Sequence, residues 1–137
     1  MYMENPSREE MKQILNDTKT IAIVGLSDKP DRTSYQIGKA LQYAGYKIIP
    51  VNPIVNEVFG IKAVPSLKDL KEPVDIINVF RRNEYLVEIA KEASEIDAKV
   101  FWCQLGLEDE EAYEIAKNAG MKVIMDRCIK VEHALTR

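Results

Sequence analysis

The sequence has few of the residues that build metal centres and disulfide scaffolds. Among 137 residues there are one histidine, His133, and two cysteines, Cys103 and Cys128. Because neither a Cys-x-x-Cys nor a His-Glu-x-x-His pattern occurs, no metal site is expected. Two cysteines are also too few for the disulfide framework of a small secreted protein, so reduced thiols are expected.

Long apolar runs and an excess of basic residues are missing as well. No apolar stretch approaches the ~18 residues that a membrane-spanning helix needs, and we expect no membrane partner. The opening segment MYMENPSREE lacks the basic-then-apolar order of a secretory signal, which favours a cytoplasmic location. The formal net charge is -3 without a basic patch of any size, so no nucleic-acid partner is expected.

The composition is typical of one globular domain. Hydrophobic residues make up 46% of the chain and charged residues 30%, which predicts a single domain over residues 1–137. Short apolar segments rich in β-branched residues recur at nearly even intervals and predict five buried strands: residues 20–26, 46–51, 74–80, 98–103 and 121–125.

Amphipathic helical patterns lie between most of these strands. The clearest ends at Gly45 and places apolar residues at the i, i+3, i+4 and i+7 positions, namely Ile37, Ala40, Leu41 and Ala44. Further helices are predicted after a Ser7–Glu10 capping box, over residues 83–95, from the acidic run 108–111 to Gly120, and over residues 128–135. The proline-rich segment 52–73 is expected to be mostly loop, with a short helix near residues 66–70.

Strands that alternate with helices imply right-handed crossovers and a parallel sheet covered on both faces. The sequence therefore predicts an α/β fold with a Rossmann-like, doubly wound, five-stranded parallel sheet in the order 3-2-1-4-5. In such sheets ligands bind beyond the carboxyl ends of the strands where the strand order reverses, here between the first and fourth strands.

The loop after the first predicted strand is a candidate phosphate site. Residues 25–34 lead into a helix near Ser34, whose N-terminal N–H groups suit a phosphate, and Arg32 adds a forked cationic donor. The alternative is that Gly25 only permits a tight turn and that Arg32 is one more solvated charge.

Missing motifs narrow the choice of phosphate ligand. No G-x-G-x-x-G follows the first strand, and the second strand ends at residues 51–53 without the acidic residue of an NAD site. The P-loop pattern fails as well, because Gly38-Lys39 is followed by Ala40 inside a predicted helix. Gly38 is expected to let that helix approach the sheet closely.

The third and fourth strands end in side chains of mixed chemistry. Phe80 precedes the basic pair Arg81-Arg82, so that one arginine can pair with a phosphate while Phe80 packs on an adenine. The alternative is that both arginines pair with nearby glutamates on the following helix. Trp102, at the end of the fourth strand, reads equally well as a core residue.

Searches for catalytic groups find little, because His133 lies near the C-terminal end and no serine or cysteine has a neighbouring base. Whether the chain is an enzyme stays open, and catalysis by the chain alone is not expected.

Several ordered motifs together resemble the small stand-alone CoA-binding proteins, which are relatives of the CoA-binding domain of succinyl-CoA synthetase α subunits. The resemblance runs over roughly residues 7–135 and rests on five segments: 24–34, 45–53, 74–82, 102–106 and 125–128.

This resemblance implies a Rossmann-like domain that binds coenzyme A at the strand carboxyl edge, in most members without a known reaction. The implied phosphate-binding residues are Gly25, Leu26, Ser27, Arg32, Thr33 and Ser34. The residues implied for the rest of the ligand are Val51, Asn52 and Pro53 beside the adenosine, Phe80 and Arg81 along the next stretch, and Trp102, Cys103 and Gln104 towards the pantetheine. The cations expected at this edge are Lys29, Arg32, Arg81 and Arg82.

The leading hypothesis is a non-catalytic carrier, sensor or accessory module for coenzyme A or acyl-CoA, with a possible enzyme partner. The alternatives are a subunit of an acyl-CoA or NAD(P)-dependent enzyme, and a thiol redox protein that uses Cys103 and Cys128. A mixed disulfide of either cysteine with CoA is a further hypothesis. Apolar residues of the last helix, such as Val131 and Leu135, either dock on the sheet or need cover, which leaves monomer and homodimer open.

Overall fold

The computed structural model describes residues 3–137, so Met1 and Tyr2 of the predicted domain lie outside the described residues. Strands and helices alternate along most of the chain: α1 (Arg8–Asp17), β1 (Thr20–Val24), α2 (Thr33–Tyr43), β2 (Lys47–Val51), β3 (Glu57–Val58), β4 (Ile61–Lys62), η1 (Leu67–Asp69), β5 (Val74–Val79), η2 (Asn83–Tyr85), α3 (Leu86–Ala93), β6 (Ala98–Cys103), α4 (Glu110–Asn118), β7 (Lys122–Ile124) and α5 (Ile129–Thr136). The five predicted strands and the predicted helices are all present.

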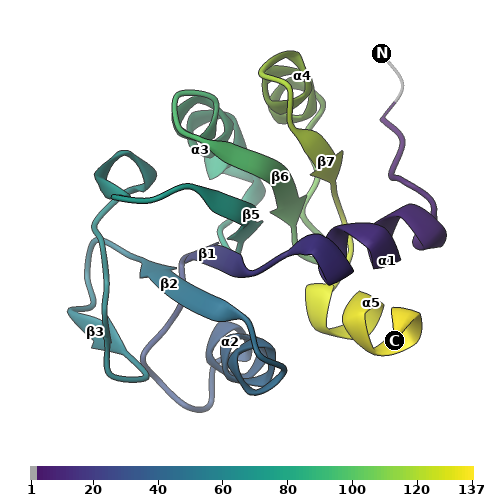
Figure 1. Cartoon of the computed structure of the whole chain (residues 1–137). Helices are drawn as coiled ribbons and strands as arrows, with labels where there is room; N and C mark the ends of the chain where they lie inside the picture. The colour runs from purple at the N-terminus through teal and green to yellow at the C-terminus, as the bar shows by residue number, and fades with distance from the viewer. Residues whose placement is uncertain (1–2) are drawn as a thin grey trace.

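The main sheet is parallel throughout and has helices on both faces (Figure 1). One apolar core lies between the sheet and α1, α2 and α5, where Ile21 and Ile23 point. The other lies under α3 and α4, where Ala22 and Val24 point. Alternate residues of each strand thus enter opposite cores, which explains why the strands read as continuous apolar runs. The predicted α/β fold with a five-stranded parallel sheet is confirmed.

The order of the strands differs from the prediction. The sheet runs β2-β1-β5-β6-β7, which is 2-1-3-4-5 when its five strands are numbered along the chain, and not 3-2-1-4-5. Pro50 lies inside β2 and has no N–H for a neighbouring strand, so β2 is suited to the sheet edge that it occupies. The third strand, β5, is central instead, and Ile76 and Ile77 are fully buried there.

Because of this strand order, the point at which the order reverses differs from the predicted one. It lies between β1 and β5, whose residues pair from Ile21–Ile76 to Val24–Val79, and not between the first and fourth strands. A doubly wound sheet of order 2-1-3-4-5 places its ligand crevice at this first–third junction. The expected pair of strands is therefore wrong, and ligand binding at the carboxyl edge stays a prediction.

The crossover from β2 to β5 contains a hairpin that the sequence did not predict. Strands β3 and β4 pair in antiparallel fashion around Phe59 and Gly60, which both have positive φ, at 57° and 76°. Two positive φ values in a two-residue loop define a turn that normally has the sequence Asn-Gly. Because Phe59 stands where asparagine is usual, the sequence does not indicate this hairpin. The phenylalanine ring packs against Tyr35 of α2, with ring centroids 4.8 Å apart. The rest of the crossover is loop with the short helix η1, as predicted.

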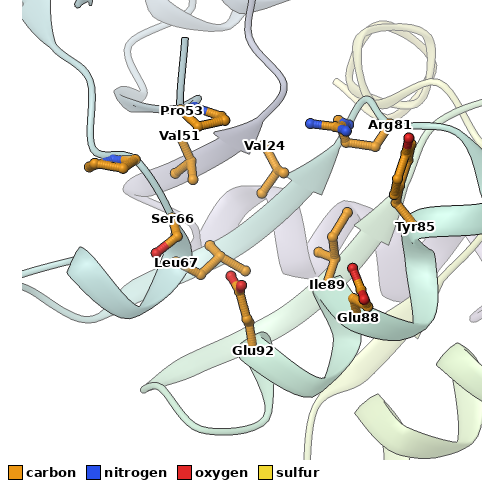
Figure 2. A pocket seen from close by; sticks show the side chains of 11 residues that line it. Val24, Val51, Pro53, Ser66, Leu67, Arg81, Tyr85, Glu88, Ile89 and Glu92 are labelled. Carbon is orange, nitrogen blue, oxygen red and sulfur yellow. The ribbon is translucent and has the colours of Figure 1, made fainter. Parts of the chain in front are cut away.

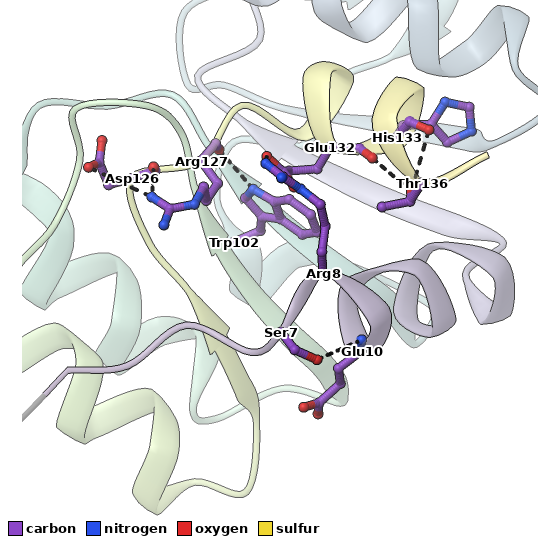
Figure 3. A network of polar contacts seen from close by, with 9 residues as sticks. All are labelled: Ser7, Arg8, Glu10, Trp102, Asp126, Arg127, Glu132, His133 and Thr136. Atoms are coloured by element: carbon purple, nitrogen blue, oxygen red, sulfur yellow. Dashed lines mark hydrogen bonds and ion pairs between the residues drawn. The ribbon is translucent and has the colours of Figure 1, made fainter.

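Two local predictions about the helices are confirmed. The Ser7 hydroxyl accepts a hydrogen bond from the Glu10 N–H at 3.1 Å and so begins α1 (Figure 3). A Cβ added to Gly38 would lie 3.0 Å from Cδ1 of Leu26, so glycine lets α2 approach the sheet closely.

Candidate functional site

The loops after β1 and β5 touch at the point where the strand order reverses. The Gly25 N–H donates to the Val51 carbonyl at 2.8 Å, and the Phe80 N–H donates to the Val24 carbonyl at 2.9 Å. Gly25 has a φ of 87°, and a Cβ added there would overlap the carbonyl oxygen of Phe80. Only glycine permits both this conformation and this close approach.

The loop of residues 25–34 is fastened to the first turn of α2. The Ser27 N–H donates to the Ser34 hydroxyl at 3.0 Å, and the Lys29 N–H donates to the Ser27 hydroxyl at 3.0 Å. Arg32 precedes α2 and makes no side-chain cap, and its side chain has no hydrogen bond or ion pair with residues 3–137. The loop thus holds an exposed guanidinium beside a helix N-terminus, where anions are favoured.

Asn52 joins this loop to the end of β2. Its side-chain amide donates to the Leu26 carbonyl at 3.1 Å and its side-chain oxygen accepts the Ile54 N–H at 2.9 Å. The two bonds leave the Ile54 side chain in water, where it is 88% exposed.

These loops surround a cleft of about 830 Å³, which we call the edge cleft. Its cations are Arg32, Arg81 and Arg82, and no aspartate or glutamate lines it among the described residues. The Arg81 guanidinium lies over the Tyr85 ring, 4.5 Å from its centroid, and Arg82 makes an exposed 3.7 Å ion pair with Glu84. The remaining lining residues are Gly25, Thr33, Ser34, Asn52, Ile54, Phe80, Gln104, Leu105 and Leu107.

The edge cleft changes in chemistry along its length. Ile54 follows β2 at one end and Leu105 follows β6 at the other, while the arginines come from loops after β1 and β5 in the middle. Three strand spacings separate β2 from β6, or about 14 Å. The cleft is therefore cationic at its centre and uncharged at both ends, where Ile54 lies near Asn52 and Leu105 near Gln104 in sequence.

A smaller cavity of about 170 Å³ opens on the α3 side of the same edge. Figure 2 shows Arg81 and Tyr85 on one side of it and Val51 and Pro53 on the other. Because Arg81 and Tyr85 also line the edge cleft, the two hollows share a wall.

Two negative findings apply to residues 3–137. No helix there is both long enough and apolar enough to cross a membrane. No group of three or more histidine, cysteine, aspartate and glutamate side chains is placed to hold a metal ion in that range.

Comparisons with known proteins identify the family. The sequence pattern of the CoA binding domain family matches residues 19–134. The chain belongs to the CoA binding domain family.

Relatives of this CoA binding domain chain differ in size. It is 58% identical over 135 residues to the uncharacterized protein YneT of Bacillus subtilis (strain 168), covering 98% of this chain and 100% of that protein. It is 30% identical over 122 residues to the acetate–CoA ligase [ADP-forming] II subunit alpha of Pyrococcus furiosus, covering 81% of this chain but 27% of the ligase subunit. A hypothetical protein from Pyrococcus horikoshii OT3 has a similar solved structure, with a TM-score of 0.92, 33% identity and 99% of both chains covered.

The edge cleft of this CoA binding domain brings together many of the residues nominated from the sequence. Eight of them line it: Gly25, Arg32, Thr33, Ser34, Asn52, Phe80, Arg81 and Gln104. Val51 and Pro53 line the smaller cavity instead, and half-buried Ser27 braces the loop between Asn52 and α2.

Three nominated residues lie in the cores rather than on the cleft wall. Leu26, Trp102 and Cys103 are each 0% exposed. The indole Nε1 of Trp102 donates to the Arg127 carbonyl at 2.9 Å, as Figure 3 shows. Their part in ligand binding stays a prediction. In this structure they pack in the cores beneath the loops of the carboxyl edge.

Gln104 ties the cleft to α5. Its side-chain oxygen accepts the Ile129 N–H at 3.0 Å and a side-chain N–H of Asn78 at 3.3 Å. Asn78 is fully buried, and its own side-chain oxygen has no hydrogen-bond partner among residues 3–137. The amide of Gln104 is therefore held by internal bonds and presents a fixed polar edge to the cleft.

The two cysteines are separated by the sheet. Cys103 packs in the core under α3 and α4, whereas Cys128 packs against the core on the α5 side. Burial raises the pKa of the Cys103 thiol, and the carboxylate of Asp109 raises it further, so this thiol is a poor nucleophile. The placement does not bring the two thiols together.

Sequence reasoning missed four lining residues: Ile54, Tyr85, Leu105 and Leu107. Each of these residues lies within a few residues of the carboxyl end of a strand, and this position in the sequence could have been used to predict them. Apolar side chains in such loops are easily taken as packing residues, because nothing in a sequence shows that they stay exposed.

Proposed function

We propose that this chain binds coenzyme A in the edge cleft. The observation that carries the proposal is the cluster of three arginines at the centre of the cleft, with uncharged side chains at both ends. CoA has its diphosphate between an adenosine, whose ribose carries the 3′-phosphate, and an uncharged pantetheine arm, so a cationic centre that leads into an uncharged end matches its distribution of charge.

The charge of the cleft supports the same ligand. CoA carries a diphosphate and a 3′-phosphate, and a chain of net charge -3 can attract it only through a local cluster of cations. The edge cleft supplies three arginines without an acidic neighbour on its wall among residues 3–137. Arginine guanidinium groups bind phosphates in forked geometry, which suits this task.

Within this proposal the chain acts as a non-catalytic carrier, sensor or accessory module. No carboxylate, imidazole or thiol lines the edge cleft among the described residues, so a reaction at the CoA thiol needs groups from elsewhere. Reduced Cys103 and Cys128 fit a cytoplasmic setting.

A second candidate is an accessory subunit of an acyl-CoA enzyme. The similarity to the ADP-forming acetate–CoA ligase subunit favours it, since this chain spans only 27% of that protein. This candidate predicts that the chain copurifies with an enzyme and that the complex, but not the chain alone, turns over acyl-CoA. A redox function through both cysteines is less favoured, because the sheet lies between them.

Calorimetric titration with CoA, dephospho-CoA, NAD and ATP tests the proposal. We expect micromolar binding of CoA that weakens as salt is added, and weaker binding of dephospho-CoA, which lacks one phosphate. Binding of NAD or ATP in preference to CoA would contradict the proposed ligand. So would the absence of any heat of binding with CoA at both low and high salt.

A further inference from the structure

The loop after β6 holds a leucine in water at one end of the edge cleft. Leu105 is 70% exposed and lines the cleft together with the half-buried Leu107. A single exposed leucine is ordinary on a protein surface. Here two leucines of one loop, on either side of Gly106, line the same cleft next to its cationic centre.

This loop is fixed by its neighbours. The Gly106 N–H donates to the Asp126 carboxylate at 2.6 Å, and the Gly106 carbonyl accepts a side-chain N–H of Asn83 at 3.3 Å. The Asp126 N–H in turn donates to the Leu107 carbonyl at 3.0 Å. The loop is thus bonded to the segments after β5 and β7 and cannot readily fold its leucine inwards.

One of the residues that hold this loop, Asp126, has an uncommon backbone conformation. Asp126 has a φ of 59°, in the left-handed region that costs a non-glycine residue free energy, although aspartate tolerates it better than most. Such conformations persist where the surroundings hold them and are frequent at ligand sites. The structure therefore maintains an exposed apolar contact in advance of any ligand.

We infer that Leu105 and Leu107 contact the acyl group of a short acyl-CoA, so that the preferred ligand is an acyl-CoA with an apolar acyl group rather than free CoA. This inference rests on the proposed function. The phosphates lie at the central arginines, and the thiol end of the ligand extends towards β6.

The two ends of the cleft differ in a way that sets this direction. The smaller cavity is lined by Pro53 after β2 and by Tyr85 after β5, whose rings offer flat surfaces suited to an adenine. Its lining also includes Glu88 and Glu92, which suit an uncharged base better than a phosphate. The β6 end offers two branched aliphatic side chains, which suit a flexible methylene chain.

The test is calorimetric titration of the purified chain with CoA, acetyl-CoA, butanoyl-CoA and hexanoyl-CoA. We expect the affinity to rise about two- to fourfold for each methylene that is added, because each buries apolar surface on the leucines. Leu105→Ser removes this dependence on chain length, so that the variant binds hexanoyl-CoA no more tightly than free CoA.

Leu135→Ser is the matched control, because Leu135 of α5 is 58% exposed and does not line the cleft. It is expected to keep the wild-type dependence on chain length. Ile54→Ser, at the β2 end of the cleft, tests the direction in which the ligand lies, and this variant is also expected to keep the dependence on chain length.

Each contrary outcome has its own meaning. Equal affinity for CoA and hexanoyl-CoA overturns the inference but leaves CoA binding in place. Loss of the chain-length dependence in Ile54→Ser rather than Leu105→Ser reverses the ligand and overturns the inference. No binding of CoA or of any acyl-CoA overturns the proposed function, and the inference fails with it.

Discussion

The two edges of the main sheet use their charged residues differently. At the amino edge, Asp75 accepts the backbone N–H groups of Lys19 and Thr20 at 2.8 and 3.0 Å and pairs with Lys99 at 3.5 Å. At the carboxyl edge, Arg32 has no side-chain partner among residues 3–137. Asp75 at the amino edge is thus joined to an opposite charge and to the backbone, whereas Arg32 at the carboxyl edge remains available to a ligand.

The hollows at the two edges differ in the same sense. The amino-edge cavity, of about 380 Å³, is lined by both acidic and basic residues, with Asp17 and Asp75 beside Lys99 and Lys122. The edge cleft has only basic ones among its charged lining residues in the described part of the chain. A mixed, internally paired edge stabilises the fold, while an edge with one sign of charge attracts a ligand of the opposite sign.

Gly25→Ala should have the largest effect, because its Cβ would overlap the Phe80 carbonyl at a φ of 87°. We expect a loss of about 3 kcal/mol in the free energy of unfolding, measured by urea denaturation. Gly120→Ala at the amino edge is the control: its φ is 93°, but nothing lies within 4 Å of the added Cβ. The control should lose only about 1 kcal/mol, and equal losses would show that close approach at the carboxyl edge is unimportant.

Arg32→Ala should weaken CoA binding about tenfold, as expected for the loss of one charge-assisted contact to a phosphate. Lys99→Ala removes one positive charge at the amino edge and should leave the affinity within about twofold, because Lys99 lies outside the edge cleft. Calorimetry on both variants checks this. Similar losses in the two would mean that CoA responds to overall charge and not to the cleft.

Asp75→Asn should have the smallest effect, about 1 kcal/mol of unfolding free energy at neutral pH. Burial alone would raise the pKa of Asp75, but the N–H groups of Lys19 and Thr20 and the charge of Lys99 together hold it below its usual value. The lowered pKa stabilises the fold above the unfolded-state pKa of about 3.9, and this contribution is lost as pH falls through the folded-state value.

Denaturation at several pH values checks the Asp75 prediction. The difference between wild type and variant should be full at neutral pH and should shrink in acid. CoA affinity should not change, because Asp75 lies at the opposite edge from the cleft. A difference that is constant with pH would contradict the role given to the carboxylate.

The fold was predictable to the level of its elements. Gly45 and the Ser7 cap predicted helix ends, and β-branched runs predicted the strands, because these signals are local. Strand order depends on which strands pair with one another, and the apolar composition of a strand does not indicate its neighbours in the sheet. The one residue that did report it was Pro50, whose missing N–H favours an edge strand.

The site was predictable where it depends on strand ends. Loops at the carboxyl edge were nominated from topology and their residues in part from the family resemblance, and Arg32, Asn52 and Arg81 do line the edge cleft. Exposure was not predictable: Trp102 is fully buried while Leu105 is 70% exposed, although they are three residues apart. Trp102 lies in β6 and packs in the core, whereas Leu105 lies in the following loop, which the Gly106–Asp126 hydrogen bond ties to a segment distant in sequence.

Mapping of backbone amide chemical shifts during a CoA titration tests the central claim most directly, because it reports both edges of the sheet in one experiment. The account predicts shifts concentrated in the loops that form the edge cleft, at residues 25–34, 80–85 and 104–107, and none at Asp75 or Lys99. Shifts concentrated around Asp75 and Lys99, or spread evenly over both edges, would contradict it.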